Sequence, residues 1–200
     1  MKIERVHREI LYNVLEKKSA RFTQKSLSQR CGISLSTVNH ALKPLIRMHA
    51  VEMHRRGFTV INPKKILVYW ACIRNLEREV VYKTHVNENV ERIETLLPPH
   101  SILTAYSAFK LRFKKVPAEY NEVIVYGRKE EFEKRFGKQE HKLPENLIVL
   151  KLDEHLLSFP SIPIAQIFVD LWNLKKWYAN DFLKALEGEI DGILAELGYR

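Results

Sequence analysis

Polar and cationic side chains share one face of a predicted helix in the N-terminal part of the chain. If residues 34–47 are helical, five of them point away from the apolar side: Ser36, Asn39, His40, Lys43 and Arg47. Short polar groups can exchange hydrogen bonds with base edges, and the cations that follow can bind phosphates. This order suits a helix laid in the major groove of double-stranded DNA. Solvated surface positions are the alternative for each of these side chains.

The distribution of charge agrees with a polyanionic partner. Residues 1–78 contain sixteen Lys or Arg and five Asp or Glu, a net charge of +11, whereas residues 79–200 carry a net charge of −2. The basic character therefore belongs wholly to the N-terminal part, as binding to nucleic acid would require. An ordinary basic surface exposed to water is the other interpretation of this charge.

The predicted elements around this face form a helix-turn-helix. A first helix is expected over about Lys2–Lys17, and Thr23 is a good N-cap for a short helix that ends near Arg30. Gly32 supplies the turn, and Ser34 caps the longer helix. That helix has apolar residues at i, i+3, i+4, i+7 and i+8: Val38, Ala41, Leu42, Leu45 and Ile46.

A hairpin should follow the second of these helices. Residues 51–54 and 58–61 are short strand-like segments, and Arg55-Arg56-Gly57 forms the turn between them. Two arginines at the tip of a hairpin are placed to meet a phosphate backbone or the minor groove. Helix, helix-turn-helix and basic hairpin, in this order, predict a winged helix.

The stretch Thr23–Val38 resembles the helix-turn-helix of MarR-like and related winged-helix regulators, and the resemblance covers about residues 3–61. It implies sequence-specific binding to double-stranded DNA. By position, the resemblance makes four residues the base-edge readers: Ser36, Thr37, Asn39 and His40. It makes four cations the phosphate contacts: Lys25, Lys43, Arg55 and Arg56. His40 and His54 could instead sense pH or bind a metal, but no second ligand lies at metal-binding spacing.

A helix that is apolar on nearly every side is expected after the hairpin. Asn62-Pro63 is a cap followed by a proline at the first helical position, and Ile66–Ile73 is almost wholly apolar. Such a helix must be covered on more than one side. It could pack on the winged helix, on a second domain, or on a second copy of the chain. DNA half-sites favour dimers, so we expect a homodimer.

The rest of the chain predicts an α/β domain that ends in two helices. Strands are expected at 80–86, 101–105, 122–126 and 146–152, and helices at 90–97, 107–113, 129–136 and 164–174. A last helix begins near Asn180 and carries an apolar seam: Leu183, Leu186, Ile190, Ile193 and Leu197. The fold class is therefore α+β, with a winged-helix domain over residues 1–78 and an α/β domain over residues 79–200.

A second resemblance concerns this α/β domain. Leu103–Ala108 is similar to the Gly-Ser element of the nucleotidyltransferase fold, and Ile164–Leu171 resembles the C-terminal part of AbiEi-type antitoxins. Those proteins join a winged helix to a nucleotidyltransferase-like domain and repress their own operons. Nucleotidyl transfer needs two carboxylates at i and i+2 on one strand to hold Mg²⁺, but Glu122 has no such companion. Asp153 is either a remnant third ligand or a surface residue.

These features together predict a transcriptional regulator. We expect no catalytic activity, no metal, no cofactor, no disulfide framework and no membrane span, and a cytoplasmic location. Double-stranded DNA is the expected partner, and a toxin-like protein or a small-molecule effector could be a further one. Two alternatives remain open: a nucleotidyltransferase-related enzyme that acts on nucleic acid, and a module whose winged helix contacts protein.

Overall fold

A computed structural model describes residues 2–138 and 143–199, and contacts within it divide the chain into two compact units. Unit 1 comprises the residues up to Arg74, Pro163–Val169 and the residues from Glu187 onward. Unit 2 comprises Asn75–Ile162 and Asp170–Leu186. The division differs from the expected domains 1–78 and 79–200, because two late stretches of the chain belong to unit 1.

Specific hydrogen bonds join these late stretches to unit 1. The backbone N–H of Ile164 donates to the Glu16 carboxylate at 2.8 Å, and the Arg8 guanidinium donates to the amide oxygen of Gln166 at 2.8 Å. Nearer the C-terminus, the hydroxyl of Tyr199 donates to the carbonyl of Val60 at 3.1 Å. These contacts connect residues more than a hundred positions apart, which the local sequence pattern cannot indicate.

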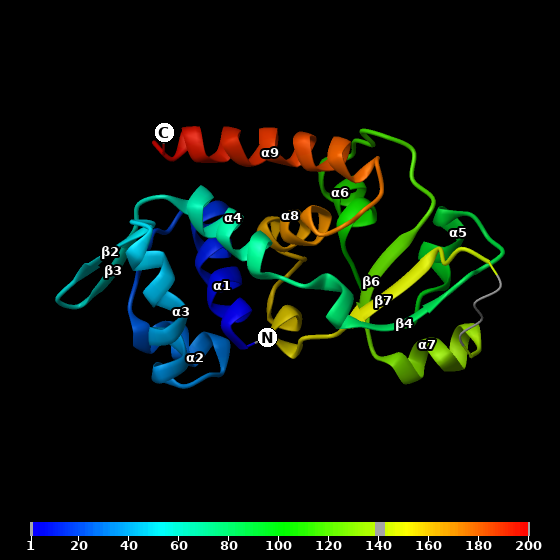
Figure 1. Ribbon diagram of the computed structural model, residues 1–200, viewed down its shortest axis with the longest axis horizontal. Helices are drawn as coiled ribbons and strands as arrows, with labels where there is room; N and C mark the ends of the chain where they lie inside the picture. The colour runs from blue at the N-terminus through cyan, green and yellow to red at the C-terminus, as the bar shows by residue number, and fades with distance from the viewer. Residues whose placement is uncertain (1, 139–142, 200) are drawn as a thin grey trace. The chain divides into compact units, whose positions relative to one another are not determined.

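Unit 1 contains the predicted winged helix-turn-helix (Figure 1). Its elements up to Arg74 are, in chain order: α1 (Lys2–Lys17), β1 (Arg21–Phe22), α2 (Gln24–Cys31), α3 (Leu35–Arg47), β2 (Val51–His54), β3 (Gly57–Val60) and α4 (Pro63–Ile73). The three strands form one antiparallel sheet in the order β1-β3-β2. The α1 helix packs against α2, α3 and α4 and so forms the centre of the unit.

The connecting helix α4 is covered on one side by unit 1 itself. Ile66, Leu67, Trp70 and Ala71 are buried, and the indole N–H of Trp70 donates to the Glu4 carboxylate on α1 at 3.1 Å. The opposite side is more open, because Cys72 is exposed. Of the three expected coverings, α4 therefore uses the winged helix for its buried face.

Unit 2 contains a mixed four-stranded sheet in the order β4-β7-β6-β5. Its elements are, in chain order: η1 (Leu76–Glu79), β4 (Val80–Thr84), α5 (Val90–Leu96), β5 (Ile102–Leu103), α6 (Ala105–Phe113), β6 (Val123–Gly127), α7 (Lys129–Phe136), β7 (Leu147–Lys151) and η2 (Glu154–Ser158). The two central strands, β6 and β7, are parallel, and both outer pairs are antiparallel. The observed order of strands and helices agrees with the order that the sequence predicts.

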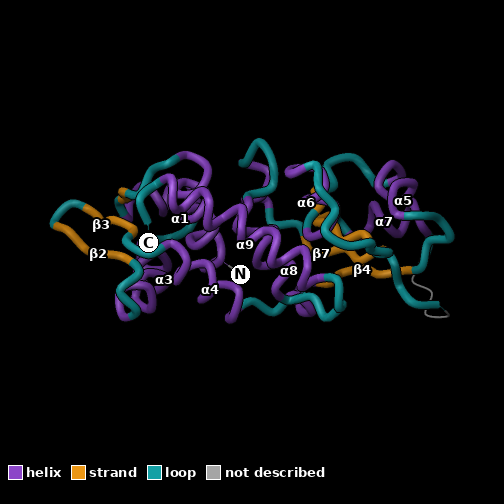
Figure 2. Tube along the Cα trace, turned by 90° about the horizontal axis from the view of Figure 1, so that it is seen from above, coloured by secondary structure: helices purple, strands orange, loops and turns teal. Residues whose placement is uncertain are grey.

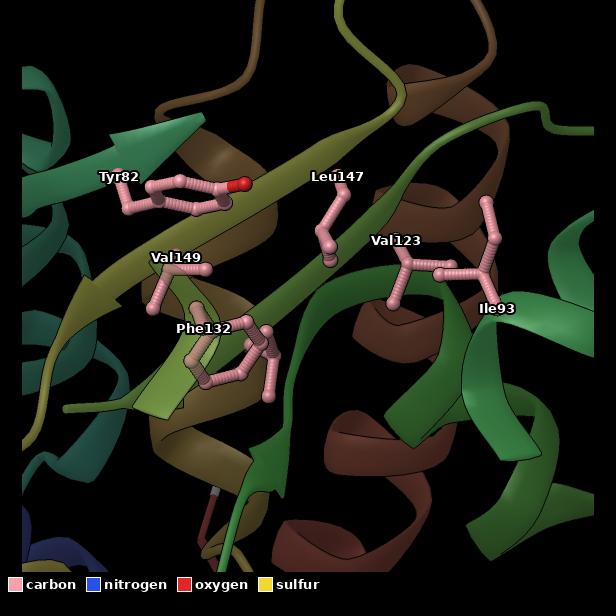
Figure 3. Packing of buried hydrophobic residues seen from close by; sticks show 7 residues of the cluster. Tyr82, Ile93, Val123, Phe132, Leu147 and Val149 are labelled. Carbon is pink, nitrogen blue, oxygen red and sulfur yellow. The ribbon is translucent and has the colours of Figure 1, made fainter. Parts of the chain in front are cut away.

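One face of this sheet holds the main apolar core of unit 2 (Figure 3). Alternate residues of the strands supply Tyr82, Val123, Val125, Leu147 and Val149, and α5 and α7 add one residue each: Ile93 and Phe132. On the other face, the hydroxyl of Tyr126 donates to the buried carboxylate of Asp170 at 2.6 Å, and the hydroxyl of Thr104 donates to it at 2.7 Å.

Two further helices, α8 (Ile164–Trp172) and α9 (Ala179–Glu196), each contribute residues to both units. Along α9 the buried apolar residues are Phe182, Leu186, Ile190 and Leu194. The expected seam was therefore wrong at three positions, because Leu183, Ile193 and Leu197 remain partly exposed. The buried residues follow one another at intervals of four, so they lie on a face of α9 next to the predicted one. Leu186 and Ile190 belong to both the predicted and the buried set.

Across residues 2–138 and 143–199, no helix is both long enough and apolar enough to span a bilayer. The same residues contain no cluster of three or more His, Cys, Asp or Glu that could hold a metal ion.

Candidate nucleic-acid interface

The turn between α2 and α3 is built by caps at both helix ends. At the beginning of α2, the Thr23 hydroxyl accepts a hydrogen bond from the backbone N–H of Ser26 at 3.0 Å. At its end, Gly32 adopts the left-handed conformation with φ of 61° and donates to the carbonyl of Gln29. A residue with a side chain would be strained in this conformation, so glycine is well suited to this turn.

Two contacts tie α2 to α1. The Arg5 guanidinium donates to the carbonyl of Cys31 at 3.2 Å, and the Cys31 thiol donates to the carbonyl of Arg5 at 3.4 Å. On the inner side of the turn, the Ser28 hydroxyl donates to the carbonyl of Ile33 at 2.6 Å. These hydrogen bonds fix α2 and the following turn on α1, and α3 begins directly after that turn.

Helix α3 presents most of the predicted base readers to solvent. Ser36, Asn39 and His40 are exposed, as is Lys43 one turn later. Thr37 is only half-exposed, because its hydroxyl lies 2.9 Å from that of Ser34 and its backbone N–H donates to Ser34 at 3.2 Å. Thr37 thus takes part in the helix cap, and the other three predicted readers lie free on the surface.

The apolar side of α3 differs from the prediction at one position. Val38, Ala41, Leu42 and Leu45 are buried, as the spacing indicates. Ile46 was expected among them, but 38% of its surface is exposed. The side chain of Ile46 lies about 100° around the helix from Leu45, which turns it toward the polar face.

The wing is the hairpin of β2 and β3, which extends beyond the helices of unit 1 (Figure 2). Both predicted phosphate contacts at its tip, Arg55 and Arg56, are exposed. At its base, β1 pairs with β3, and the rings of Phe22 and Phe58 stack with centroids 5.4 Å apart. Gly57 is necessary there, because a Cβ atom would collide with the carbonyl oxygen of Phe22.

A hollow of about 590 Å³ lies between the wing and the beginning of α2. Arg21 and Arg56 line it, together with His54 and Ser26. The sequence pattern did not single out Arg21, since only its pairing through β1 brings it beside the wing. Two guanidinium groups around one concavity can receive a phosphate, so Arg21 joins the candidate interface.

The electrostatic character of the interface is strongly positive. Residues 17–51 include seven Lys or Arg and no Asp or Glu. One of the seven, Arg30, is engaged by Glu9 at 3.3 Å and Asn13 at 3.0 Å. The fourth predicted phosphate contact, Lys25 on α2, is exposed. The exposed Glu52 on β2 is a carboxylate within the wing, so repulsion of phosphates is weakest along residues 17–51.

A buried histidine lies behind this surface. His7 of α1 is fully buried, with its ring 5.6 Å from that of Tyr69 and 6.3 Å from that of Trp70. Burial disfavours the charged imidazolium and lowers the pKa of His7 to about 4, although the charge of Glu4 opposes this shift. His7 is therefore a neutral part of the core at neutral pH.

Unit 2 contains the two acidic residues that the comparison with nucleotidyl transfer singled out, Glu122 and Asp153. Glu122 is buried just before β6, and burial raises the pKa of its carboxyl. Every residue of β6 itself is uncharged. Asp153 caps η2, where its carboxylate accepts from the backbone N–H of His155 at 3.2 Å. Tyr106 is buried beside the rings of Tyr120 and Phe182.

Of the four histidines in residues 79–200, the structure describes His85, His100 and His155, and His141 lies outside the described residues.

Comparison with known proteins identifies the N-terminal module. Residues 3–52 match the family of winged helix-turn-helix DNA-binding domains. The match ends within β2, and the structure adds the remainder of the wing. No curated protein and no solved structure matches the chain. The comparisons therefore support the winged helix, and they give no support to the resemblance of residues 79–200 to nucleotidyltransferases or AbiEi-type antitoxins.

Proposed function

We propose that this protein is a transcriptional regulator that binds double-stranded DNA with sequence specificity. The observation that carries the proposal is the exposed face of α3, with Ser36, Asn39, His40 and Lys43, inside a segment that matches winged helix-turn-helix DNA-binding domains. Helices of this kind enter the major groove with their first residues at the base edges.

The wing and α2 complete the proposed contact. Arg55 and Arg56 at the hairpin tip, with Arg21 at its base, bind the phosphate backbone beside the groove, and Lys25 binds it from α2. Phosphate contacts fix the position of the protein on the duplex, whereas α3 reads the sequence.

Selection of bound sequences from random duplex DNA tests this proposal. The full chain should enrich a defined motif, and its affinity for that motif should fall steeply as the salt concentration rises. A chain that enriches no motif but binds all duplexes equally would contradict sequence specificity. A chain that binds no duplex at all would favour the alternative in which the winged helix contacts another protein.

The regulator should act as a homodimer. One winged helix reads few base pairs, so useful discrimination over a genome needs two linked modules. Light scattering at micromolar concentration should give a mass of about 47 kDa, twice the chain mass of 23.6 kDa. Trp70 of α4 is buried within the chain, so a substitution there would test folding as well as assembly. A protein that stays monomeric with and without its DNA site would exclude the dimer.

Residues 79–200 should serve regulation and not catalysis. Support comes from the isolated, buried Glu122 and from the absence of any carboxylate on β6 itself. An assay for incorporation of labelled nucleotide into nucleic acid, with Mg²⁺ present, should give no product. Control of the protein's own operon, as AbiEi-type antitoxins exert, is the narrower form of the proposal. A reporter fused to the DNA upstream of the gene would test it.

A further inference from the structure

The exposed side of α3 begins with an apolar residue. Leu35 directly follows the capping residue Ser34, and 51% of its surface is exposed. The residues that pack α3 into unit 1 form a different set, on the other side of the helix: Val38, Ala41, Leu42 and Leu45. A single exposed leucine is common on proteins, so its place on the molecule matters more than its exposure.

That place is the first turn of the helix that reads bases. Residues four apart on a helix lie on the same face, with Cβ atoms roughly 5–6 Å apart. Leu35 and Asn39 are related in this way, and both are exposed. Successive bases on one strand are about 3.4 Å apart along the duplex. The two side chains are therefore spaced to reach bases one or two steps apart.

The chemistry of each side chain selects a base. In the major groove, thymine presents its C5 methyl group, which an aliphatic side chain contacts. Adenine presents an acceptor at N7 and a donor at N6, which the amide of asparagine can bond together. Cytosine has no methyl group at the corresponding position, and guanine presents two acceptors in place of adenine's pattern.

We propose that α3 reads a thymine methyl group through Leu35 and an adenine, one or two steps away, through Asn39. The inference rests on the proposed function and adds the class of operator, a site in which a thymine and an adenine lie one or two steps apart. Thr37, whose hydroxyl is engaged with Ser34 at 2.9 Å, stays a predicted reader that this proposal does not use.

Base analogues that differ by one group test each contact. In the duplex selected by the full chain, each thymine is replaced in turn by uracil, which lacks only the C5 methyl. We expect one replacement to weaken binding about fourfold, the effect of one methyl-sized apolar contact. Leu35→Ala should bind the thymine and uracil duplexes equally, and Leu35→Met should retain the difference. Replacement of one adenine by 7-deazaadenine should weaken binding roughly tenfold, and Asn39→Ala should abolish that effect.

Leu111 of α6, of which 49% is exposed, supplies the control. Leu111→Ala should leave the uracil effect unchanged, and all variants should unfold at the temperature of the unmodified protein. A uracil effect that persists in Leu35→Ala, or a selected motif without a required thymine, would overturn the inference and leave DNA binding intact. If the unmodified protein bound no duplex, the proposed function itself would fail.

Discussion

Arg74 at the end of α4 and Glu4 on α1 form an ion pair in which both side chains are buried. Burial alone raises the pKa of Glu4, but the charge of Arg74 and hydrogen bonds from Trp70 and Arg74 outweigh it, so the pKa lies below its ordinary value. The pair fixes the end of the connecting helix against the helix on which the winged-helix unit is built.

Glu4→Gln should strongly destabilise unit 1. The substitution removes the charge of Glu4 from its buried ion pair with Arg74, at a cost of about 3–5 kcal/mol of unfolding free energy. Urea denaturation of the full chain measures this loss. Replacement of both partners, Glu4→Gln with Arg74→Met, should recover part of the stability, because a buried pair can often be exchanged for apolar packing. If the single and double variants lost equal amounts of unfolding free energy, Glu4 and Arg74 would not be energetically coupled.

The double variant Arg55→Ala with Arg56→Ala should weaken binding to every duplex. Each phosphate contact that is lost should flatten the dependence of log affinity on log salt by roughly 0.9. Binding titrations over a range of salt concentrations measure the slope. Lys151→Ala with Lys184→Ala removes the same charge from exposed positions of unit 2 and should leave the slope unchanged. An unchanged slope in the wing variant would place the wing outside the interface.

His40→Ala should relax sequence discrimination. The exposed imidazole on α3 is proposed to bond a base edge, and loss of such a contact costs about 1–3 kcal/mol of discrimination. The affinity for unrelated duplexes should hardly change, since those depend on phosphate contacts. Competition between the selected site and its single-base variants measures the effect. A uniform loss of affinity for all sequences would make His40 a phosphate contact.

The stability of unit 1 should fall in acid because of His7. In the unfolded chain His7 binds a proton below its ordinary pKa of 6.5, whereas in the folded protein it does so only near 4. Stability is therefore complete above about pH 6.5 and declines by about 1.4 kcal/mol per unit as the pH falls toward 4. Urea denaturation of the full chain and of His7→Leu, at about pH 7.5 and about pH 5.5, isolates this contribution. If both proteins lost stability equally, another group would be responsible.

Gly57→Ala should destabilise the wing. The added Cβ atom meets the backbone of Phe22, which cannot move without breaking the pairing of β1 with β3, and such overpacking costs about 1–3 kcal/mol. Gly188→Ala in α9 is the matched control, because nothing lies within 4 Å of the added atom. That variant should gain roughly 0.5–1 kcal/mol from helix propensity. Thermal unfolding of both variants, compared with the unmodified protein, distinguishes the two effects.

Local sequence signals predicted the parts of this structure that depend on neighbouring residues. The caps at Thr23 and Ser34 and the turn at Gly32 act within a few residues, and the structure confirms all three. The hairpin with Arg55 and Arg56 at its tip also depends on neighbouring residues, and it too is present in the structure. The strands and helices of unit 2 were likewise predictable from periodicity, with ends that differ by a few residues.

The sequence did not predict contacts between distant parts of the chain, or roles that depend on which residues are neighbours in space. No local pattern reveals that Tyr199 bonds Val60, so the sequence does not show that late stretches of the chain pack within unit 1. Arg21 and Leu35 were overlooked for a different reason. An arginine in a two-residue strand, or a leucine at the beginning of an amphipathic helix, has a visible role only when its neighbours in space are known.

Residues near the C-terminus pack in unit 1, so part of that unit is synthesised long after the winged helix. Val60 and Tyr199 are 139 residues apart, and translation at roughly 5–20 residues per second separates them by about 7–28 s. During that interval the winged helix leaves the ribosome without Tyr199, which later bonds Val60 at the base of its hairpin. A nascent chain that stops early would carry every proposed base reader on an incomplete scaffold. Truncated chains would therefore lack the hydrogen bond from Tyr199 to Val60 at the base of the wing.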